Sequence, residues 1–158
     1  MKVSIYSRKS AEELMQTGFP SNTAVVSFYD PPSSSRRGSL APVDYSGKAS
    51  RVFQVAIHDI DISVLPDYNM TYDTYFPEVS GLAEFIYEAK ADGLEIICQC
   101  EYGQSRSAAC AAAILEHFYK TGISVFADYR YYPNQVVYHK VFDALESFKA
   151  KQNGGLLK

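Results

Sequence analysis

The sequence predicts an α/β fold, because segments with strand periodicity alternate along the chain with segments of helical periodicity. Residues 23–29 are rich in β-branched and aromatic side chains and read as a buried strand. A short alternating segment at residues 2–6, a helical segment and this strand follow in close succession, which indicates a right-handed parallel crossover. Further along, an apolar run at residues 94–98 leads through a loop into an alanine-rich helical run at residues 108–117.

The remaining elements continue this alternation. Ser10 and Glu13 have the spacing of a capping box, which predicts a helix from Ser10 through Met15 that ends at Gly18. Between these elements and the chain end we expect a strand over 51–58, a helix from about Pro77 to Lys90, a turn at Gly93, a helix over 108–119 stopped by Gly122, a short helical turn within 124–132 and a last helix capped by Asn134.

Residues 30–50 form the longest stretch without an expected element, and their Pro, Ser and Gly content excludes a helix or a central strand. A loop of this length is either mobile or functional. Within it, Arg36 and Arg37 either meet a phosphorylated partner or are simply solvated. The chain shows no repeats, so we expect a single domain over residues 1–158 with a frayed tail at 153–158.

Length and composition limit the function classes. The 158 residues are 47% hydrophobic and 21% charged, which suits one globular core. The net charge of −3 argues against a general nucleic-acid binder. No stretch approaches the ~20 apolar residues of a membrane span, and residues 1–9 lack a signal-peptide core. The cysteines, Cys98, Cys100 and Cys110, are odd in number and too closely spaced for a disulfide framework, so we expect a reducing cytoplasm.

The chemistry concentrates in the 100–106 loop, where a cysteine, five residues and an arginine connect the apolar run to the helical run. A chain that leaves a strand and enters a helix points free N–H groups at one spot, where the helix dipole adds positive potential. A phosphate dianion would bind there, and the same field favours the thiolate of Cys100, a nucleophile. Arg106 offers a planar fork for two phosphate oxygens, and Gly103 permits a positive φ.

The same residues admit two other interpretations. Cys100 could be a buried cysteine at a strand end, with Arg106 an unrelated surface residue. Cys98 and Cys100 could bind zinc, but their spacing is not the usual gap of two to four residues and no second Cys/His cluster follows. We therefore expect no metal and no cofactor.

Residues 100–107, Cys-Glu-Tyr-Gly-Gln-Ser-Arg-Ser, resemble the signature of cysteine-based protein phosphatases, closest to the dual-specificity branch and its bacterial members. The resemblance implies a protein tyrosine phosphatase-like α/β fold with a central, mostly parallel sheet of four to five strands and helices on both faces. It implies that Cys100 attacks phosphorus, Arg106 binds the phosphoryl group and Ser107 supports the sulfur as a leaving group. The implied phosphate-binding residues are Glu101, Tyr102, Gly103, Gln104, Ser105 and Arg106.

One departure from this family pattern stands beside the nucleophile. The family usually has His before the cysteine, where this chain has Gln99. The loss of that His removes one support for the thiolate, so the resemblance implies a slower reaction or a higher pH optimum.

The resemblance also implies a general acid, an aspartate on a loop after the strand that precedes the nucleophile's strand. Asp59 is the first candidate, because it lies just past the strand beside His58, and Asp61 is the second. Asp67 and Asp73 fit less well, and each of these aspartates could instead only stabilise a turn or a cap. Asp128 would suit the layout of low-molecular-weight tyrosine phosphatases, whose cysteine loop, however, opens the chain. His117 and His139 are not expected to be catalytic.

The sequence thus predicts a metal-independent phosphatase for phosphomonoesters on protein tyrosine, serine or threonine, acting through a cysteinyl phosphate. Its expected partner is a phosphorylated protein or another phosphomonoester substrate, with no nucleic acid and no membrane, in the cytoplasm. Two alternatives remain: a phosphate-binding module with little turnover, and a phosphatase for a lipid, an RNA end or a small metabolite. Glu101 and Gln104 in the loop favour protein over a polyanionic lipid.

Overall fold

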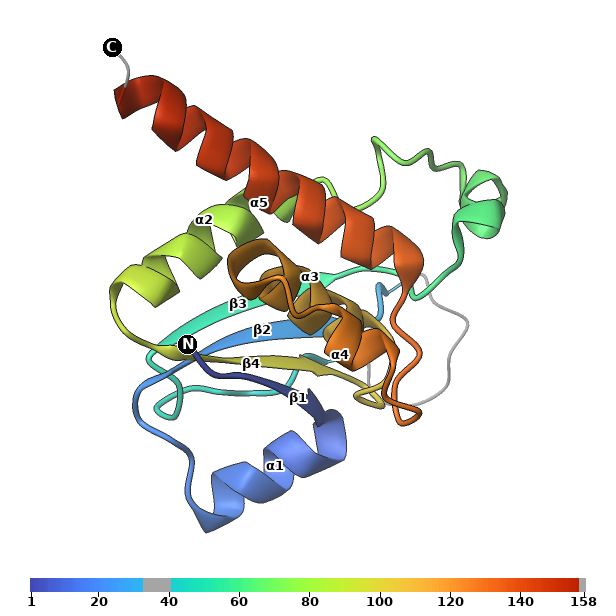
Figure 1. Ribbon diagram of the computed structural model, residues 1–158. Coiled ribbons are helices and arrows are strands. Elements are labelled where there is room, and N and C mark those ends of the chain that lie inside the picture. Colours follow the sequence, from blue (N-terminus) through green and yellow to red (C-terminus); the bar gives the residue numbers. More distant parts are fainter. Residues whose placement is uncertain (33–40, 157–158) are drawn as a thin grey trace.

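Four parallel strands form the central sheet of the computed structural model, which describes residues 1–32 and 41–156. They pair in the order β1-β4-β2-β3, so the strand that comes last in the sequence lies between the first two (Figure 1). The predicted α/β fold with a parallel sheet is confirmed. The strands are β1 (Val3–Ser7), β2 (Thr23–Tyr29), β3 (Arg51–Ala56) and β4 (Glu95–Cys100).

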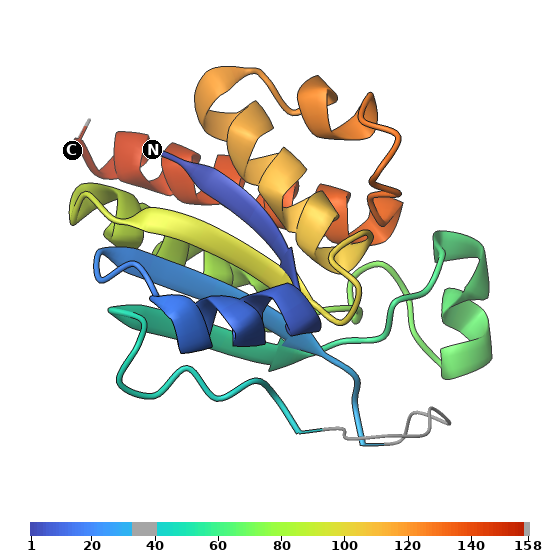
Figure 2. The ribbon, with the colours of Figure 1, turned by 90° about the horizontal axis from the view of Figure 1, so that it is seen from below.

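Helices cover both faces of this sheet, as expected. One face carries α1 (Arg8–Thr17), and the opposite face carries three long helices (Figures 1 and 2). The long helices pack on one another and the sheet, since α5 contacts both α2 and α3. They are α2 (Val79–Ala91), α3 (Arg106–Tyr119) and α5 (Gln135–Leu156). The short α4 (Ile123–Phe126) lies between α3 and α5, and the 3₁₀ helix η1 (Ile62–Tyr68) lies between β3 and α2.

Side-chain alternation along β4 assigns its residues to two cores. Ile96 and Cys98 join the large core beneath α2, α3 and α5, whereas Ile97 joins a smaller core beneath α1. Successive side chains of a strand point to opposite faces. Cys100 therefore belongs with the α3 face, where it is part of the large core, and Gln99 faces the α1 side.

The N-terminus of α1 differs from the prediction. The helix begins at Arg8 and its N-cap is Ser7, not Ser10. The Oγ of Ser7 accepts from Ser10 N at 3.0 Å, and Ser7 N donates back to Ser10 Oγ at 2.9 Å. The capping box is thus a Ser–Ser pair three residues earlier than the one expected, because a serine can supply the reciprocal bond that Glu usually makes. Gly18 ends the helix as predicted.

The helices after the 100–106 loop also refine the expected boundaries. The α3 helix starts at Arg106, two residues before Ala108, and it ends at Tyr119 as predicted. Its C-cap is Lys120 in the left-handed conformation, so the helix stops before Gly122. Asn134 caps α5 as predicted, because its Oδ1 accepts from Val137 N at 3.0 Å. The α5 helix continues through Leu156, whereas the sequence predicts a frayed tail from residue 153.

Residues 30–32 and 41–50 contain no helix or strand, in agreement with the loop predicted between β2 and β3. Arg36 and Arg37 lie outside the described residues. Within the described ranges, no helix has both the length and the apolar character needed to cross a bilayer.

Candidate active site

The parallel sheet brings the ends of all four strands to one edge, where the 100–106 loop joins β4 to α3. This loop passes close over the end of β1. Gly103 has φ +67°, and a Cβ added there would lie 2.6 Å from Ser7 N and 2.9 Å from Tyr6 C. Glu101 O accepts a bond of 3.0 Å from Arg8 N, the first residue of α1. The turn predicted at Gly103 thus requires glycine for both its conformation and its packing.

Two carbonyl groups at the end of the loop accept hydrogen bonds from the segment before α5. Gln104 O accepts from Tyr132 N at 2.8 Å, and Ser105 O accepts from Asn134 N at 3.2 Å. Among the residues that the structure describes, the amides of Gly103, Gln104 and Ser105 donate to no protein acceptor. Such donors at the start of a helix form a site for an anion.

Cys100 lies at the base of a cavity of about 370 Å³, with 3% of its surface exposed. Its Sγ is 3.0 Å from Ser107 Oγ in the first turn of α3. The hydroxyl group can therefore donate to a sulfur anion. The cavity is lined by Asp30, His58, Asp59, Ile60, Tyr68, Cys100, Tyr102, Gln104, Ser105, Arg106 and Tyr132.

The other two cysteines do not reach this cavity. Cys98, Cys100 and Cys110 are all free thiols, and Cys98 and Cys110 are fully buried in the large core. A hydrogen bond with Cys110 and complete burial raise the pKa of the Cys98 thiol, which disfavours its thiolate. In the described part of the chain, no three His, Cys, Asp or Glu side chains gather as metal ligands.

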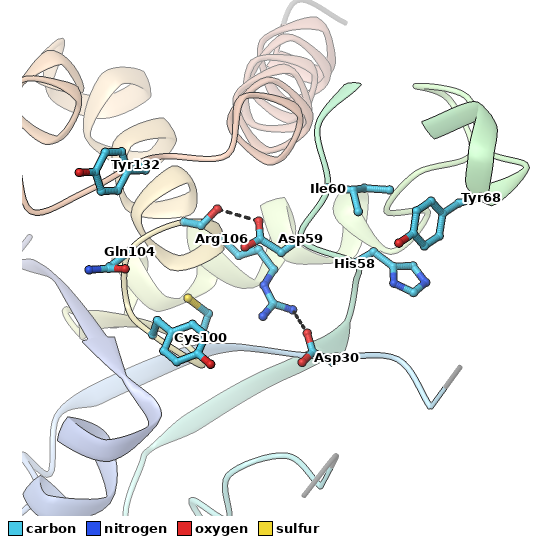
Figure 3. Close-up of a pocket in the computed structure, with 11 residues that line it drawn as sticks. Asp30, His58, Asp59, Ile60, Tyr68, Cys100, Gln104, Arg106 and Tyr132 are labelled. Atoms are coloured by element: carbon cyan, nitrogen blue, oxygen red, sulfur yellow. Dashed lines mark hydrogen bonds and ion pairs between the residues drawn. The ribbon is translucent and has the colours of Figure 1, made fainter. Parts of the chain in front are cut away.

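The Arg106 side chain enters the same cavity from the first residue of α3 and is 2% exposed. Its Nη1 donates to Ile57 O at 2.8 Å and forms an ion pair of 3.0 Å with Asp30 (Figure 3). Its Nε is buried and has no hydrogen-bond partner among the described residues. An unsatisfied buried donor costs about 1–3 kcal/mol, so this nitrogen is a position where a bound acceptor would stabilise the site.

The structure separates the two leading acid candidates. Asp59 lines the cavity, and its Oδ1 accepts from Ser105 Oγ at 2.6 Å and from Asn134 Nδ2 at 2.9 Å. Asp61 is instead the N-cap of η1, accepting from Ser63 N at 3.2 Å, and it is not among the lining residues. In Figure 3, Cys100 and Asp59 lie on two sides of the Arg106 side chain. Cys100, Arg106, Ser107 and Asp59 thus come together, and Asp61 does not join them.

Tyr75 holds the segment that carries Asp59. Its hydroxyl donates to His58 O at 2.6 Å, and its ring is 1% exposed. Burial raises the pKa of Tyr75 well above its usual value, and the negative charge of Asp59 raises it further. Tyr75 therefore stays neutral and remains a hydrogen-bond donor.

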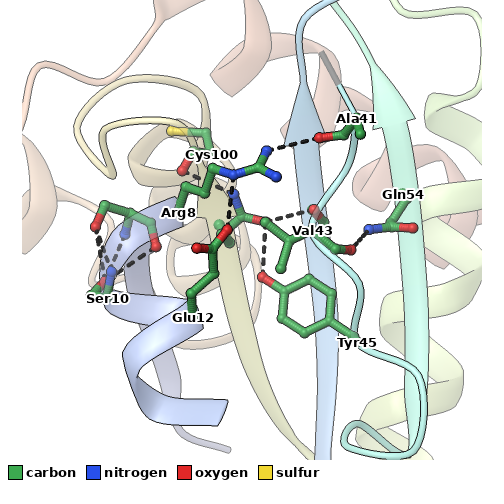
Figure 4. A network of polar contacts seen from close by, with 11 residues as sticks. Arg8, Ser10, Glu12, Ala41, Val43, Tyr45, Gln54 and Cys100 are labelled. Carbon is green, nitrogen blue, oxygen red and sulfur yellow. Dashed lines mark hydrogen bonds and ion pairs between the residues drawn. The ribbon is translucent and has the colours of Figure 1, made fainter. Parts of the chain in front are cut away.

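Gln99 lies behind Cys100 in a buried polar network on the α1 side of the sheet. Its Oε1 accepts from Ser27 Oγ at 2.6 Å and from Tyr45 OH at 2.8 Å, and its Nε2 donates to Cys100 O at 3.0 Å. Tyr45 comes from the segment before β3, which also carries Ala41 and Val43 (Figure 4). The residue at the position of the family's usual His is thus neutral and hydrogen-bonded through both its Oε1 and its Nε2, and it holds the backbone of Cys100.

Sequence reasoning missed Asp30 as a site residue and found Asn134 only as a cap. Asp30 follows β2 directly, and Asn134 Nδ2 bonds both Asp59 Oδ1 and Ile60 O at 2.9 Å. A signal for Asp30 was present, because the carboxyl ends of parallel strands meet at one edge of the sheet. The hydrogen bonds of Asn134 join segments far apart in sequence, so no local sequence pattern indicates them.

Solved structures with the same fold are found among phosphatases. Over 94% of this chain and 92% of the other, it matches human DUSP28 with a TM-score of 0.56 and 16% identity. The human tyrosine phosphatase-like serine/threonine/tyrosine-interacting protein matches with a TM-score of 0.54 and 17% identity over 95% and 92% of the chains. The PTP-2 phosphatase of Cydia pomonella matches with a TM-score of 0.51 and 11% identity over 90% and 85%.

These likenesses are structural. No protein-family model and no curated protein sequence matches the chain. The chain therefore has the fold of dual-specificity and related tyrosine phosphatases, with a cysteine, an arginine and an aspartate gathered at the edge of its sheet.

Proposed function

We propose that this protein is a metal-independent phosphatase that hydrolyses phosphomonoesters through a cysteinyl-phosphate intermediate. The observation that carries the proposal is the arrangement around one cavity of the Cys100 sulfur, the open amides of Gln104 and Ser105 and the unpartnered Nε of Arg106. Together these groups supply a nucleophile and the donors that a phosphoryl group needs. The shared fold supports the same conclusion.

The first step transfers the phosphoryl group to sulfur. The Cys100 thiolate attacks phosphorus, a P–S bond forms and the P–O bond to the leaving group breaks. Asp59, held by Ser105 and Asn134, gives its proton to the departing oxygen. Charge that spreads over the equatorial oxygens is stabilised by Arg106 and the loop amides, so the reaction needs no metal ion.

The second step releases inorganic phosphate. Asp59, now a carboxylate, accepts a proton from a water molecule as its oxygen attacks phosphorus, and the P–S bond breaks. The electron pair returns to sulfur, which Ser107 stabilises through its Oγ at 3.0 Å. The enzyme regains its thiolate and a protonated Asp59, ready for another cycle.

The proposed substrate is a phosphorylated protein. Glu101 and Gln104 occupy loop positions where basic side chains would favour a polyanionic lipid. Tyr68 and Tyr132 line the cavity and offer apolar surface to the chain around a phosphorylated residue. A reducing compartment such as the cytoplasm would preserve the free thiol that the mechanism requires.

A second candidate, a phosphate-binding module with little turnover, is favoured by one observation. Gln99 makes its contacts with the neutral groups of Ser27, Tyr45 and the Cys100 carbonyl, so it brings no positive charge to the nucleophile. This candidate predicts that the parent protein binds tungstate and phosphopeptides, that binding survives Cys100→Ser, and that hydrolysis is near zero.

Hydrolysis of p-nitrophenyl phosphate in the presence of EDTA distinguishes the two candidates. We expect turnover by the parent protein, none by Cys100→Ser, and a loss of about 10²–10³-fold for Arg106→Lys, because an ammonium group cannot replace the bidentate fork. Cys110→Ala removes a thiol from the buried core and serves as the matched control with retained activity. Turnover by Cys100→Ser would refute the covalent mechanism.

The acid is assigned by a second comparison. On an alkyl phosphate, whose leaving group is poor, Asp59→Asn should lower kcat about 10²–10⁴-fold and flatten the basic limb of the pH profile. Asp61→Asn, which exchanges only the cap of η1, should retain that limb. Equal and mild losses in the two variants would overturn the assignment.

A further inference from the structure

We propose that Asp30 is a positioning residue for the reaction: it holds the guanidinium of Arg106 so that its free edge faces the phosphoryl group. This inference rests on the proposed function. Asp30 directly follows β2, and its side chain is 15% exposed where it lines the cavity together with Cys100. Its Oδ1 lies 3.0 Å from Arg106 Nη1 (Figure 3).

The guanidinium has two edges that each present a pair of parallel N–H groups to an acceptor. Nη1 carries two N–H groups; it donates to Ile57 O at 2.8 Å, and it forms an ion pair with Asp30 Oδ1 at 3.0 Å. Nη1 lies on the same side of the guanidinium as Cδ. The N–H group of Nε therefore points in parallel with an N–H group of Nη2, and these two form one bidentate edge. Because Ile57 and Asp30 occupy Nη1, the Nε–Nη2 edge is the one that can bind a ligand. Nε has no partner among the described residues.

The two oxygens that contact Nη1 follow different strands. Ile57 follows β3 and Asp30 follows β2, and the two strands are neighbours in the sheet. The hydrogen bond to Ile57 O alone would leave the guanidinium free to turn about that contact. The ion pair with Asp30 adds a second fixed contact, which restrains the orientation that bidentate binding of a phosphoryl group requires.

The charge of Asp30 has a second role in this arrangement. Arg106 is 2% exposed, and a buried cation without a counterion is strongly disfavoured. Asp30 supplies the counterion when no phosphate is bound. An uncharged side chain with an oxygen at this position can orient the guanidinium but cannot balance its charge. A side chain without such an oxygen can neither orient the guanidinium nor balance its charge.

The test compares Asp30→Ala with Asp30→Asn. Asp30→Asn keeps a side-chain oxygen beside Nη1 and should retain kcat for p-nitrophenyl phosphate within about threefold, whereas Asp30→Ala should lower kcat about 10–100-fold, since misalignment costs less than the loss of the whole donor. Calorimetry should show tungstate binding weakened about tenfold or more in Asp30→Ala and little changed in Asp30→Asn. Asp92→Ala, which breaks an Asp–Arg pair with Arg51 at the other end of the sheet, is the control and should change neither value.

A double-mutant cycle shows whether Asp30 acts through Arg106. In an Arg106→Lys background no planar fork is left to orient, so adding Asp30→Ala should cause no further loss of kcat. A full additional loss would overturn the proposal, as would a folded Asp30→Ala protein with unchanged kcat and tungstate affinity. A flattened basic limb in Asp30→Asn would also overturn it, because Asp30 would then be a proton donor.

The test of Asp30 can fail or succeed independently of the proposed phosphatase function. If the parent protein binds tungstate but does not turn over, the phosphatase proposal fails, and the calorimetric comparison still decides the role of Asp30. If the parent protein is active and both Asp30 variants match it, the phosphatase proposal stands and the inference about Asp30 is wrong.

Discussion

Replacement of Gly103 by alanine should damage both stability and activity, because the 100–106 loop crosses the end of β1 at this residue. Gly103 has φ +67°, and an added Cβ would lie 2.6 Å from Ser7 N. Both neighbouring atoms closest to that Cβ belong to the backbone of β1, so no side chain can rotate away to make room. The loop or the strand must move.

The expected magnitude has two parts. A residue with a Cβ in the left-handed region costs roughly 1–2 kcal/mol, and forcing extra volume into a packed site costs about 1–3 kcal/mol. We therefore expect Gly103→Ala to lower the free energy of unfolding by about 2–5 kcal/mol. Relief of the contact from 2.6 Å to the 3.4 Å of ordinary packing requires a shift of about 0.8 Å, and misplacement on this scale can cost about 10²-fold in rate.

Urea unfolding followed by tyrosine fluorescence suits this measurement, because the chain has 13 tyrosines and no tryptophan. Gly47→Ala is the matched control: Gly47 has φ +72°, with nothing within 4 Å of an added Cβ. It should show the conformational cost alone, about 1–2 kcal/mol, with unchanged hydrolysis of p-nitrophenyl phosphate. Equal stability losses in the two variants, with activity kept in Gly103→Ala, would refute the packing argument.

Three further predictions follow from the polar contacts. Asn134→Ala should lower stability by about 1 kcal/mol through the lost cap, and it should reduce kcat more for an alkyl than for an aryl phosphate because Asp59 loses a donor; equal losses for both substrates would contradict this role. Tyr45→Phe removes one of the two donors to Gln99 Oε1 and should cost about 1 kcal/mol in urea unfolding; an unchanged midpoint would count against the network. Burial raises the pKa of Tyr45 and Tyr75 well above the usual value of about 10. Their contribution to stability is complete below pH ~10 and is lost as pH rises towards the folded-state pKa, by up to about 1.4 kcal/mol per pH unit for each. Unfolding at pH 9, 10 and 11 should show this slope, and Tyr45→Phe should reduce it by one tyrosine.

Local patterns in the sequence predict much of this architecture. The alternation of elements identified the strands to within a few residues, and the spacing from Cys100 to Arg106 placed both at the two ends of one turn. This works because a strand, a tight loop and a helix N-terminus are defined by neighbours along the chain. The position of Asp59 just past β3 could be inferred for the same reason.

The rest of the site depends on contacts between distant segments. The ion pair of Asp30 with Arg106 joins residues on either side of two strands and a helix, so no spacing rule indicates it. The choice between Asp59 and Asp61 was open because both follow the same strand, and the bonds from Ser105 and Asn134 distinguish them. The cap at Ser7 was missed because Ser10 returns the hydrogen bond that glutamate would supply.

The position of β4 between β1 and β2 has a consequence for synthesis of the chain. In the finished sheet, Ile5 is aligned with Cys98 and Val26 with the same cysteine from the other side. A nascent polypeptide that has been synthesised only as far as β3 therefore lacks the strand between β1 and β2. In such a chain β1 has no strand to pair with until residues 95–100 leave the ribosome. Insertion of that last strand closes the gap and brings Cys100 to the edge of the sheet, so a chain that stopped before residue 95 would lack the cavity that Cys100 lines.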